Sequence, residues 1–176
     1  GGFEALSELV TCLPKKTGFV YFLAQHYARG EKSVLAELLG RKSRIKVASV
    51  VEGMIFKPDT LYVLSPELKI TIVKNKPVAL RSELTLPPPL PNVDFLFEEL
   101  SSIQESKTIA ILLSGTGYDG TKGMQSVKEH KGITIAQVAS EAMFEQMPMN
   151  AVRANTVDYV LPIAEMGQKL FKLSIS

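Results

Sequence analysis

Short apolar runs alternate with amphipathic segments along the second half of the chain. In the amphipathic segments, hydrophobic residues recur every three or four positions, which is typical of helices with one buried face. The runs between them are rich in Val, Ile and Leu, as expected of strands that are buried on both faces. The pattern predicts strands over Lys107–Ser114, Gly132–Gln137 and Val157–Leu161, and helices over Val93–Ser106, Thr121–His130, Ala139–Phe144, Pro148–Ala154 and Ile163–Leu173.

The first half of the chain has the same kind of pattern, interrupted by two irregular stretches. Helices are predicted over Phe3–Leu13 and Glu31–Leu39, and strands over Gly18–Gln25 and Ile45–Val51. Leu61–Leu64 and Leu68–Val73 flank a Ser-Pro-Glu turn signal, so we expect them to form a hairpin. Lys74–Pro91 ends in a proline-rich run, and we expect an extended covering loop because proline disrupts helices and central strands.

Strands that alternate with helices favour an α/β fold in which helices cover both faces of a parallel sheet. We therefore predict a doubly wound, mainly parallel sheet with one antiparallel hairpin near the edge, formed by a single domain over residues 1–176. Ligands in such sheets bind at the carboxyl ends of the strands. The residues that directly follow strands are therefore the first candidates for function.

The composition argues against several classes of function. The 176 residues include 20 basic and 18 acidic side chains, a net charge of +2, which is too balanced for a protein held to nucleic acid or membrane by charge. There is no tryptophan, so a base-stacking platform is not expected. The one cysteine, Cys12, cannot form an internal disulfide or a zinc or iron–sulfur site, and we expect no metal, no cofactor and a reducing cytoplasm. No run approaches the roughly 18 apolar residues that a membrane helix needs.

The two histidines differ in their expected surroundings. His130 lies at the end of a predicted helix, where a solvated side chain favoured by the helix dipole is the simplest interpretation. His26 directly follows a predicted strand, and Asp119 lies in the turn after another. A carboxylate in that place can orient the histidine and stabilise its imidazolium, so the pair predicts general-base chemistry. Asp119 alone would also suit the N-cap of the helix that follows it.

The turn that holds Asp119 also matches a dinucleotide-binding pattern. Residues 115–120 read Gly-Thr-Gly-Tyr-Asp-Gly between a predicted strand and helix, with Glu141 about 20 residues further on. However, Asp119 places a negative charge where a pyrophosphate would bind, and the next strand ends in Gln137 rather than an acid. We favour the His–Asp interpretation and keep dinucleotide binding as an alternative.

No side chain of the sequence is well placed as a nucleophile for this pair. Cys12 falls among the apolar positions of a helix, so we expect a buried core residue. Ser114 lies in the turn of Asp119 itself, and Ser33 and Ser140 are candidates for helix starts. A residue just before Gly1 would be well placed, because glycines that open a helix after a strand accompany serines close to oxyanion-binding amides.

Taken in order along the chain, these motifs resemble the catalytic domain of the chemotaxis protein-glutamate methylesterases, the CheB family. The resemblance covers nearly the whole chain, and its first motif is the tail of a Ser-[Thr/Ala]-Gly-Gly turn. The matching segments are Gly1–Leu6, Gln25–His26, Glu52–Gly53 with Pro58, Tyr62–Val63 and Pro66, Pro91–Asp94 with Phe97, Gly115–Gly120, Ala136–Gln137 with Ser140 and Met147–Pro148, and Val157–Pro162.

The resemblance implies a serine hydrolase that removes methyl esters from glutamates of chemoreceptors, releases methanol and also deamidates receptor glutamines. His26 would be the general base and Asp119 its orienting carboxylate. The turn and oxyanion region would comprise Gly1, Gly2, Thr116 and Gly117. The implied partners are methylated cytoplasmic helices of chemoreceptors and a receiver or methyltransferase domain, with no nucleic acid and no membrane insertion.

The sequence departs from the family pattern in two places. The triad serine would lie two positions before Gly1, so we expect it and the first parallel strand to precede this sequence. Thr116 stands where the family commonly has Met, and Ser114–Gly117 more closely resembles the version fused to a receptor methyltransferase. The alternative is a catalytically inactive module of the same fold that binds a receptor or partner, which is favoured if no serine precedes Gly1.

Overall fold

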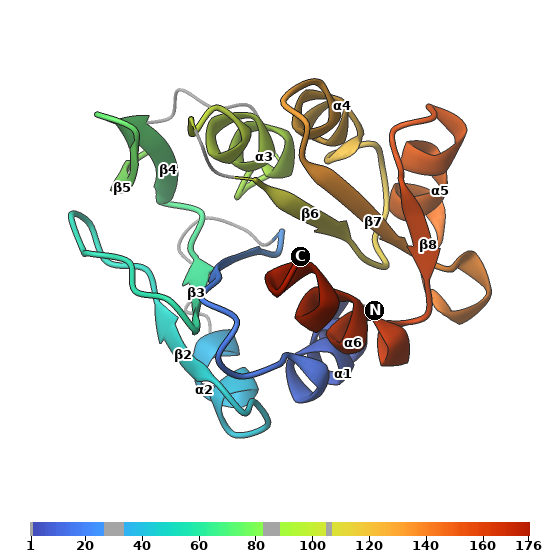
Figure 1. The fold of residues 1–176 in the computed structure, drawn as a ribbon, viewed down its shortest axis with the longest axis horizontal. Helices are drawn as coiled ribbons and strands as arrows, with labels where there is room; N and C mark the ends of the chain where they lie inside the picture. Colours follow the sequence, from blue (N-terminus) through green and yellow to red (C-terminus); the bar gives the residue numbers. More distant parts are fainter. Residues whose placement is uncertain (1, 27–33, 83–88, 105–106) are drawn as a thin grey trace.

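The structure is a computed structural model that describes residues 2–26, 34–82, 89–104 and 107–176 (Figure 1). Its strands are β1 (Val20–Ala24), β2 (Lys46–Ser49), β3 (Thr60–Leu64), β4 (Leu68–Val73), β5 (Lys76–Arg81), β6 (Ile109–Leu112), β7 (Ile133–Gln137) and β8 (Tyr159–Leu161). Its α-helices are α1 (Gly2–Cys12), α2 (Leu35–Gly40), α3 (Val93–Ser101), α4 (Thr121–Glu129), α5 (Gln146–Arg153) and α6 (Ile163–Ser174), with a 3₁₀ helix at Ala139–Glu141.

The parallel strands form two three-stranded sheets. The order is β1-β3-β2 in the first sheet and β6-β7-β8 in the second, and every pairing within both is parallel. The middle strands are the most buried: all five residues of β3 and four of the five in β7 are buried. The predicted mainly parallel α/β fold is confirmed, and β1 and β6 are edge strands of their respective sheets.

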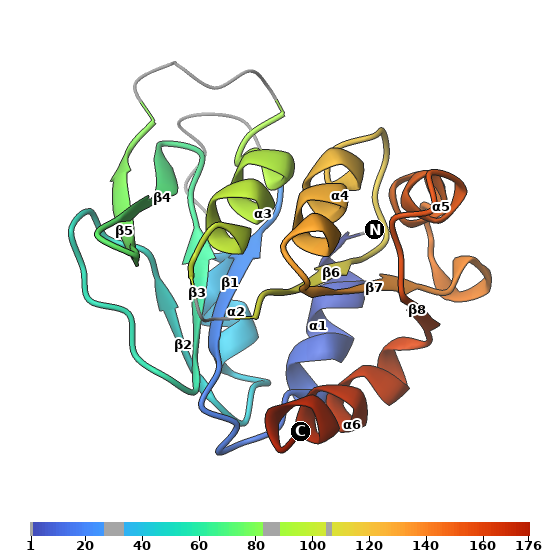
Figure 2. The same cartoon turned by 45° about the horizontal axis from the view of Figure 1, so that its top comes forward.

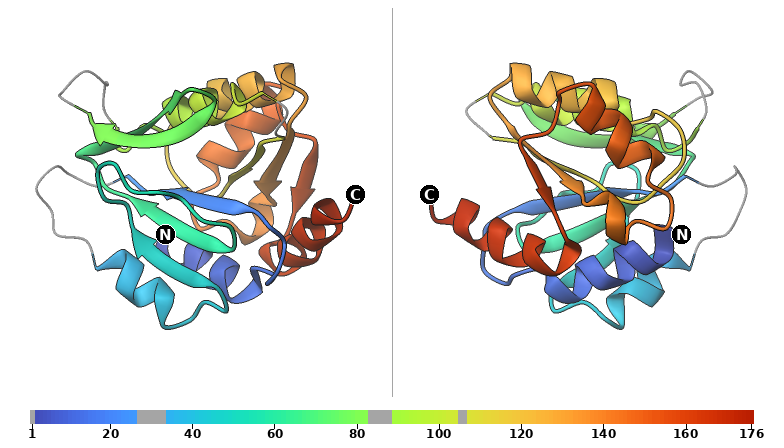
Figure 3. Two further views of the ribbon diagram at one scale, coloured as in Figure 1. Left: turned by 60° about the vertical axis from the view of Figure 1, so that its left-hand side comes forward. Right: turned by 90° about the vertical axis from the view of Figure 1, so that its right-hand side faces the viewer.

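Helices cover both faces of the sheets, with α1, α2 and α6 on one side and α3, α4 and α5 on the other (Figures 2 and 3). The side chains of β3 alternate between these layers. Leu61 and Val63 pack with residues of α1, α2 and α6, whereas Tyr62 and Leu64 pack with Leu96 of α3. Both faces of the strand are therefore apolar, which explains why it appears in the sequence as a continuous apolar run.

The antiparallel hairpin lies one strand later than the sequence predicts. β3 pairs in parallel with β1 and β2, and β4 pairs antiparallel with β5. The interpretation of Leu61–Leu64 and Leu68–Val73 as a hairpin is therefore wrong. Part of the expected loop Lys74–Pro91 is also a strand, and residues 83–88 of its proline-rich end lie outside the described residues.

The connection between β4 and β5 explains the hairpin. Lys74 and Asn75 both have positive φ, 48° and 62°, as a two-residue type I′ turn requires. Pro77 is tolerated in β5 because this strand has β4 as its one strand partner among the described residues. The turn signal is weak in the sequence because lysine is not a typical residue for that position.

Two further expectations need adjustment. Cys12 is half-buried rather than a core residue, at the point where α1 crosses α6. A Cβ atom on Gly167 of α6 would lie 2.1 Å from the Cys12 carbonyl oxygen, so the two backbones approach closely there. The predicted helix over Ala139–Phe144 is a 3₁₀ helix that ends at Glu141. Within the described ranges, none of the helices is both long and apolar enough to cross a membrane.

Candidate active site

His26 and Asp119 meet where β1 and β6 end. The Nε2 atom of His26 lies 2.6 Å from Oδ2 of Asp119, although the two residues are 93 positions apart in the sequence. The His26 side chain is 26% exposed and that of Asp119 is 6% exposed. The structure therefore brings together the two side chains that the sequence pairs, with the histidine nearer to solvent.

Asp119 accepts two further hydrogen bonds, both from the first turn of α3. The Val93 amide donates to Oδ2 at 2.9 Å, and the Asp94 amide donates to Oδ1 at 2.8 Å. Burial disfavours the charged carboxylate, but the hydrogen bonds from His26 and from these amides outweigh it and lower the pKa of Asp119. The positive end of a helix also favours a negative charge here. The geometry thus holds Asp119 ionised, the form that stabilises an imidazolium.

The contact also distinguishes the two nitrogens of the imidazole ring. Since Nε2 of His26 faces Asp119, it is the nitrogen that carries the proton of this hydrogen bond. The Nδ1 atom is then the nitrogen left to accept a proton from a nucleophile. This arrangement is the reverse of the common triad, in which the carboxylate binds Nδ1.

Asp94, rather than Asp119, serves the N-terminus of α4. The cap residue of α4 is Gly120, which has a φ of 101° and whose lack of a side chain leaves the cap to another residue. Oδ1 of Asp94 accepts the amides of Gly120 at 2.9 Å and Gly123 at 2.7 Å. The interpretation of Asp119 as an N-cap is therefore wrong. The sequence offered two signals for Asp94, an acidic residue in the first turn of a helix and a place in the Pro-x-Val-Asp motif.

The turn before Asp119 is hydrogen-bonded to the loop that precedes α5. The Gly115 amide donates to the Phe144 carbonyl at 2.8 Å, and the Gly117 amide donates to Oε1 of Gln146 at 3.2 Å. In return, Oγ of Ser114 accepts the Phe144 amide at 2.9 Å. These contacts engage the amides that a pyrophosphate would need, so the turn does not fit the dinucleotide alternative. They also engage the Gly117 amide, which the sequence assigns to the oxyanion region.

A cavity of about 810 Å³ lies beside the His–Asp pair, between β1 and β6. Residues of α1 and α3 line it, together with mostly apolar side chains of the two strands. His26, Gly2 and Thr116 also line it, so two residues of the predicted oxyanion region border the same cavity as the histidine. Gly1 lies outside the described residues.

The other candidates from the sequence lie elsewhere or have other roles. His130 directly follows α4 and is exposed, and its Nδ1 lies 2.8 Å from the Ser126 carbonyl oxygen. The prediction of a solvated side chain at a helix end is therefore confirmed. Ser140 lies in the 3₁₀ helix and is exposed, and Ser33 lies outside the described residues. Across the described ranges, no three His, Cys, Asp or Glu side chains gather closely enough to hold a metal ion.

Comparison with known proteins gives a consistent result. The model of the family described as CheB methylesterase matches residues 1–170. The Oceanobacillus iheyensis protein named protein-glutamate methylesterase/protein-glutamine glutaminase is 33% identical over 178 residues, which cover 98% of this chain and 50% of that protein. A Leptospira interrogans relative whose name carries the same two activities is 28% identical over 173 residues, 98% of this chain and 90% of its own.

A solved structure extends the match to the fold. The crystal structure of the Thermotoga maritima CheB methylesterase catalytic domain superposes with a TM-score of 0.90 at 30% sequence identity. The match covers 98% of this chain and 93% of the Thermotoga chain. The sequence therefore spans about half of some relatives and almost all of a catalytic domain.

Proposed function

The chain belongs to the CheB methylesterase family, and from this premise we propose that it is the catalytic part of a protein-glutamate methylesterase that also acts as a protein-glutamine glutaminase. The observation that carries the proposal is the 2.6 Å hydrogen bond between His26, which lines the cavity, and a buried, ionised Asp119. Such a pair supplies a general base whose positive charge is stabilised as it forms.

The proposed reaction follows from that geometry. Nδ1 of His26 takes the proton of a serine hydroxyl as the oxygen attacks the carbonyl carbon of the glutamyl methyl ester. The tetrahedral oxyanion collapses to an acyl-enzyme as the protonated His26 gives its proton to departing methanol. Water then attacks the acyl-enzyme with His26 again as base. The serine oxygen leaves and takes the proton back from His26, and the glutamate carboxylate is released. Asp119 stays ionised throughout and stabilises the imidazolium.

The nucleophile of this proposal is a serine two positions before Gly1. The cavity supports that assignment. Both β1 and β6 line it, and each of them has a strand partner on one side only among the described residues. A parallel strand between them would pair with both and would lead directly into α1 at Gly2 in the strand–helix–strand order of β/α units. Its carboxyl end would then deliver the serine beside His26.

The proposed substrates are methylated cytoplasmic helices of chemoreceptors, and the proposed location is the cytoplasm where those helices lie. A receiver or methyltransferase domain is the proposed regulatory or fused partner. The local sequence Ser114–Gly117, which resembles the methyltransferase-fused version, supports the second of these.

The direct test is release of methanol from methylated receptor fragments. The protein with its natural segment before Gly1, the 176-residue chain and the His26→Ala variant of the longer protein are assayed side by side. We expect methanol from the longer protein alone. Activity of the 176-residue chain would identify a nucleophile other than the upstream serine, and inactivity of all three on a substrate that a known methylesterase cleaves would favour the binding module.

A further inference from the structure

Asp94 and Asp119 form a reciprocal contact between two helix N-termini. The amides of Val93 and Asp94, in the first turn of α3, bind the carboxylate of Asp119. The amides of Gly120 and Gly123, at the start of α4, bind Oδ1 of Asp94. Each helix start therefore has two amide donors bound by a carboxylate from the other segment. Asp119 directly precedes Gly120, so a contact that fixes the Gly120 amide also fixes the peptide group on the carboxyl side of Asp119.

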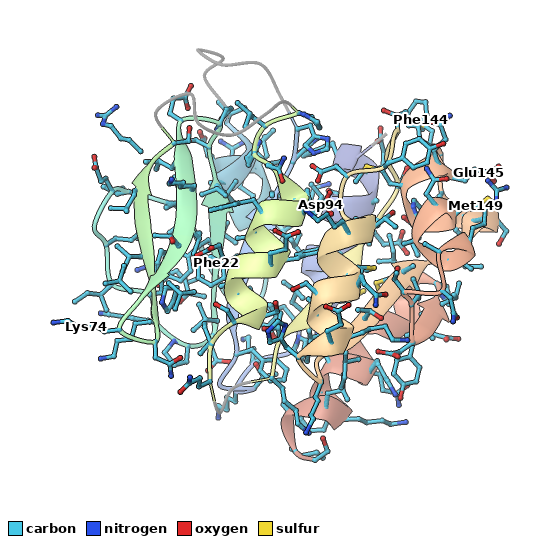
Figure 4. All side chains as sticks on the ribbon, turned by 90° about the horizontal axis from the view of Figure 1, so that it is seen from above. Phe22, Lys74, Asp94, Phe144, Glu145 and Met149 are labelled. Atoms are coloured by element: carbon cyan, nitrogen blue, oxygen red, sulfur yellow. The ribbon has the colours of Figure 1, made fainter. Side chains whose placement is uncertain are left out.

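Close packing of α3 and α4 makes this contact possible. A Cβ atom on Gly123 would lie 2.7 Å from Cβ of Phe97 and 3.0 Å from Cα and the carbonyl oxygen of Asp94. A side chain at position 123 would therefore push the helices apart. Figure 4 shows Asp94 in the first turn of α3, on the side of the helix next to α4. The glycine permits the approach, and the approach places the Asp94 carboxylate over the amides of α4.

The surroundings of Asp94 disfavour its negative charge. Burial raises the pKa of Asp94, hydrogen bonding from Gly123 opposes this, and the nearby charge of Asp119 raises it further. A single oxygen of Asp94, Oδ1, accepts both amides of α4, so the contact ties the start of α4 to the first turn of α3. The arrangement makes sense if the two segments must be held in register with each other.

We propose that Asp94 is a positioning residue, which holds the Gly120 end of the turn so that Asp119 presents Oδ2 to Nε2 of His26. It does not touch the reacting atoms and acts through Asp119. Loss of its carboxylate leaves the amides of Gly120 and Gly123 without their acceptor and lets the turn shift. A shift of about 1 Å in a catalytic group can lower turnover by about 100-fold.

The test compares Asp94→Ala with Asp94→Asn and Glu98→Ala in the full-length protein. Asparagine keeps one oxygen acceptor for both amides. Glu98 belongs to the same helix pair, because it forms a 3.5 Å ion pair with Lys122 of α4. Its charge acts on Asp94, but the amides of Gly120 and Gly123 donate to Asp94 rather than to Glu98, so Glu98→Ala is the control for a change of charge that leaves the contact with α4 in place. The readouts are kcat, KM, the melting temperature and the downfield proton resonance of the His26 Nε2–H that donates to Asp119.

We expect Asp94→Ala to lower kcat by about 10- to 100-fold with little change in KM and to weaken or remove the resonance. Asp94→Asn should keep the resonance and most of kcat, and Glu98→Ala should change neither. An Asp94→Ala protein that folds and keeps both kcat and the resonance would overturn the proposal. So would an equal loss in the alanine and asparagine variants with the resonance intact.

A second variant keeps the proposal testable if Asp94→Ala does not fold. Gly123→Ala leaves Asp94 in place but separates the helices, and it should weaken the same resonance; an unchanged resonance in the folded variant would refute the role. The kcat readout rests on the proposed function, whereas the resonance does not. If wild-type protein releases no methanol but Asp94→Ala removes the resonance, the positioning role stands and the proposed function fails.

Discussion

The two halves of the molecule each supply one member of the His–Asp pair, but they hold it differently. His26 lies two residues after β1 of the first sheet, and the hydrogen bond that fixes its side chain within the described residues is the one to Asp119. Asp119 follows the second sheet and is held by His26 and by two amides of α3. The acid is therefore positioned largely without the base, whereas the base depends on the acid.

This difference predicts unequal effects on the hydrogen bonds of the site when one side of the pair is lost. Loss of His26 removes one of three donors to Asp119 and leaves the carboxylate bound to backbone. Loss of the Asp119 carboxylate removes the partner of His26 and also leaves the amides of Val93 and Asp94 without an acceptor. We therefore regard the second sheet and α3 as the rigid side of the site.

The largest expected effect is on catalysis. His26→Ala and Asp119→Asn should each lower ester hydrolysis by about 10⁴-fold, because the first removes the base and the second removes the charge that stabilises its imidazolium. The measurement is methanol release under single-turnover conditions, with circular dichroism to show that both variants fold. Activity within tenfold of wild type in either variant would contradict the assignment of the pair.

The same contrast between fixed and less fixed regions appears within the second sheet, where β7 is the middle strand and β8 is at the edge. Ile135 of β7 is fully buried, whereas Val160 of β8 is 46% exposed. Ile135→Ala should lower the free energy of unfolding by about 2–5 kcal/mol, since it leaves a cavity in the core. Val160→Ala should change it by less than about 1 kcal/mol. Urea denaturation measures both, and equal losses would show that β8 is buried in the functional protein.

The sequence predicted the buried strands and the His–Asp pair because both depend on local signals. Continuous apolar runs identify β3 and β7, and a polar residue after such a run marks the sheet edge where ligands bind. The partners of a strand depend on tertiary contacts instead. Leu61–Leu64 and Leu68–Val73 are adjacent in the sequence and separated by a turn signal, yet β3 is enclosed by β1 and β2.

The support around Asp119 was harder to predict for a related reason. Asp94 lies 25 residues away in the sequence from Asp119, and their contact runs through backbone amides that have no sequence signature. Gly123 gave no signal either, because a glycine inside a helix usually only weakens it. Its role is apparent only when α3 lies against α4.

The smallest expected effect is a difference in pH dependence between the two carboxylates. The pKa of Asp119 is lowered in the folded state, so its contribution to stability is present above the unfolded value of 3.8 and is lost as pH falls through the folded value. The pKa of Asp94 is raised, so its contribution is complete below 3.8 and is lost as pH rises through the folded value.

Wild type, Asp119→Asn and Asp94→Asn are compared by urea denaturation at pH 3 and pH 5, where carboxylates rather than histidines titrate. The destabilisation by Asp119→Asn should grow from pH 3 to pH 5, and that by Asp94→Asn should shrink. If the two destabilisations change in the same direction between pH 3 and pH 5, folding shifts the pKa values of both carboxylates in the same direction. The contrast between Asp119 and its positioning residue Asp94 would then fail.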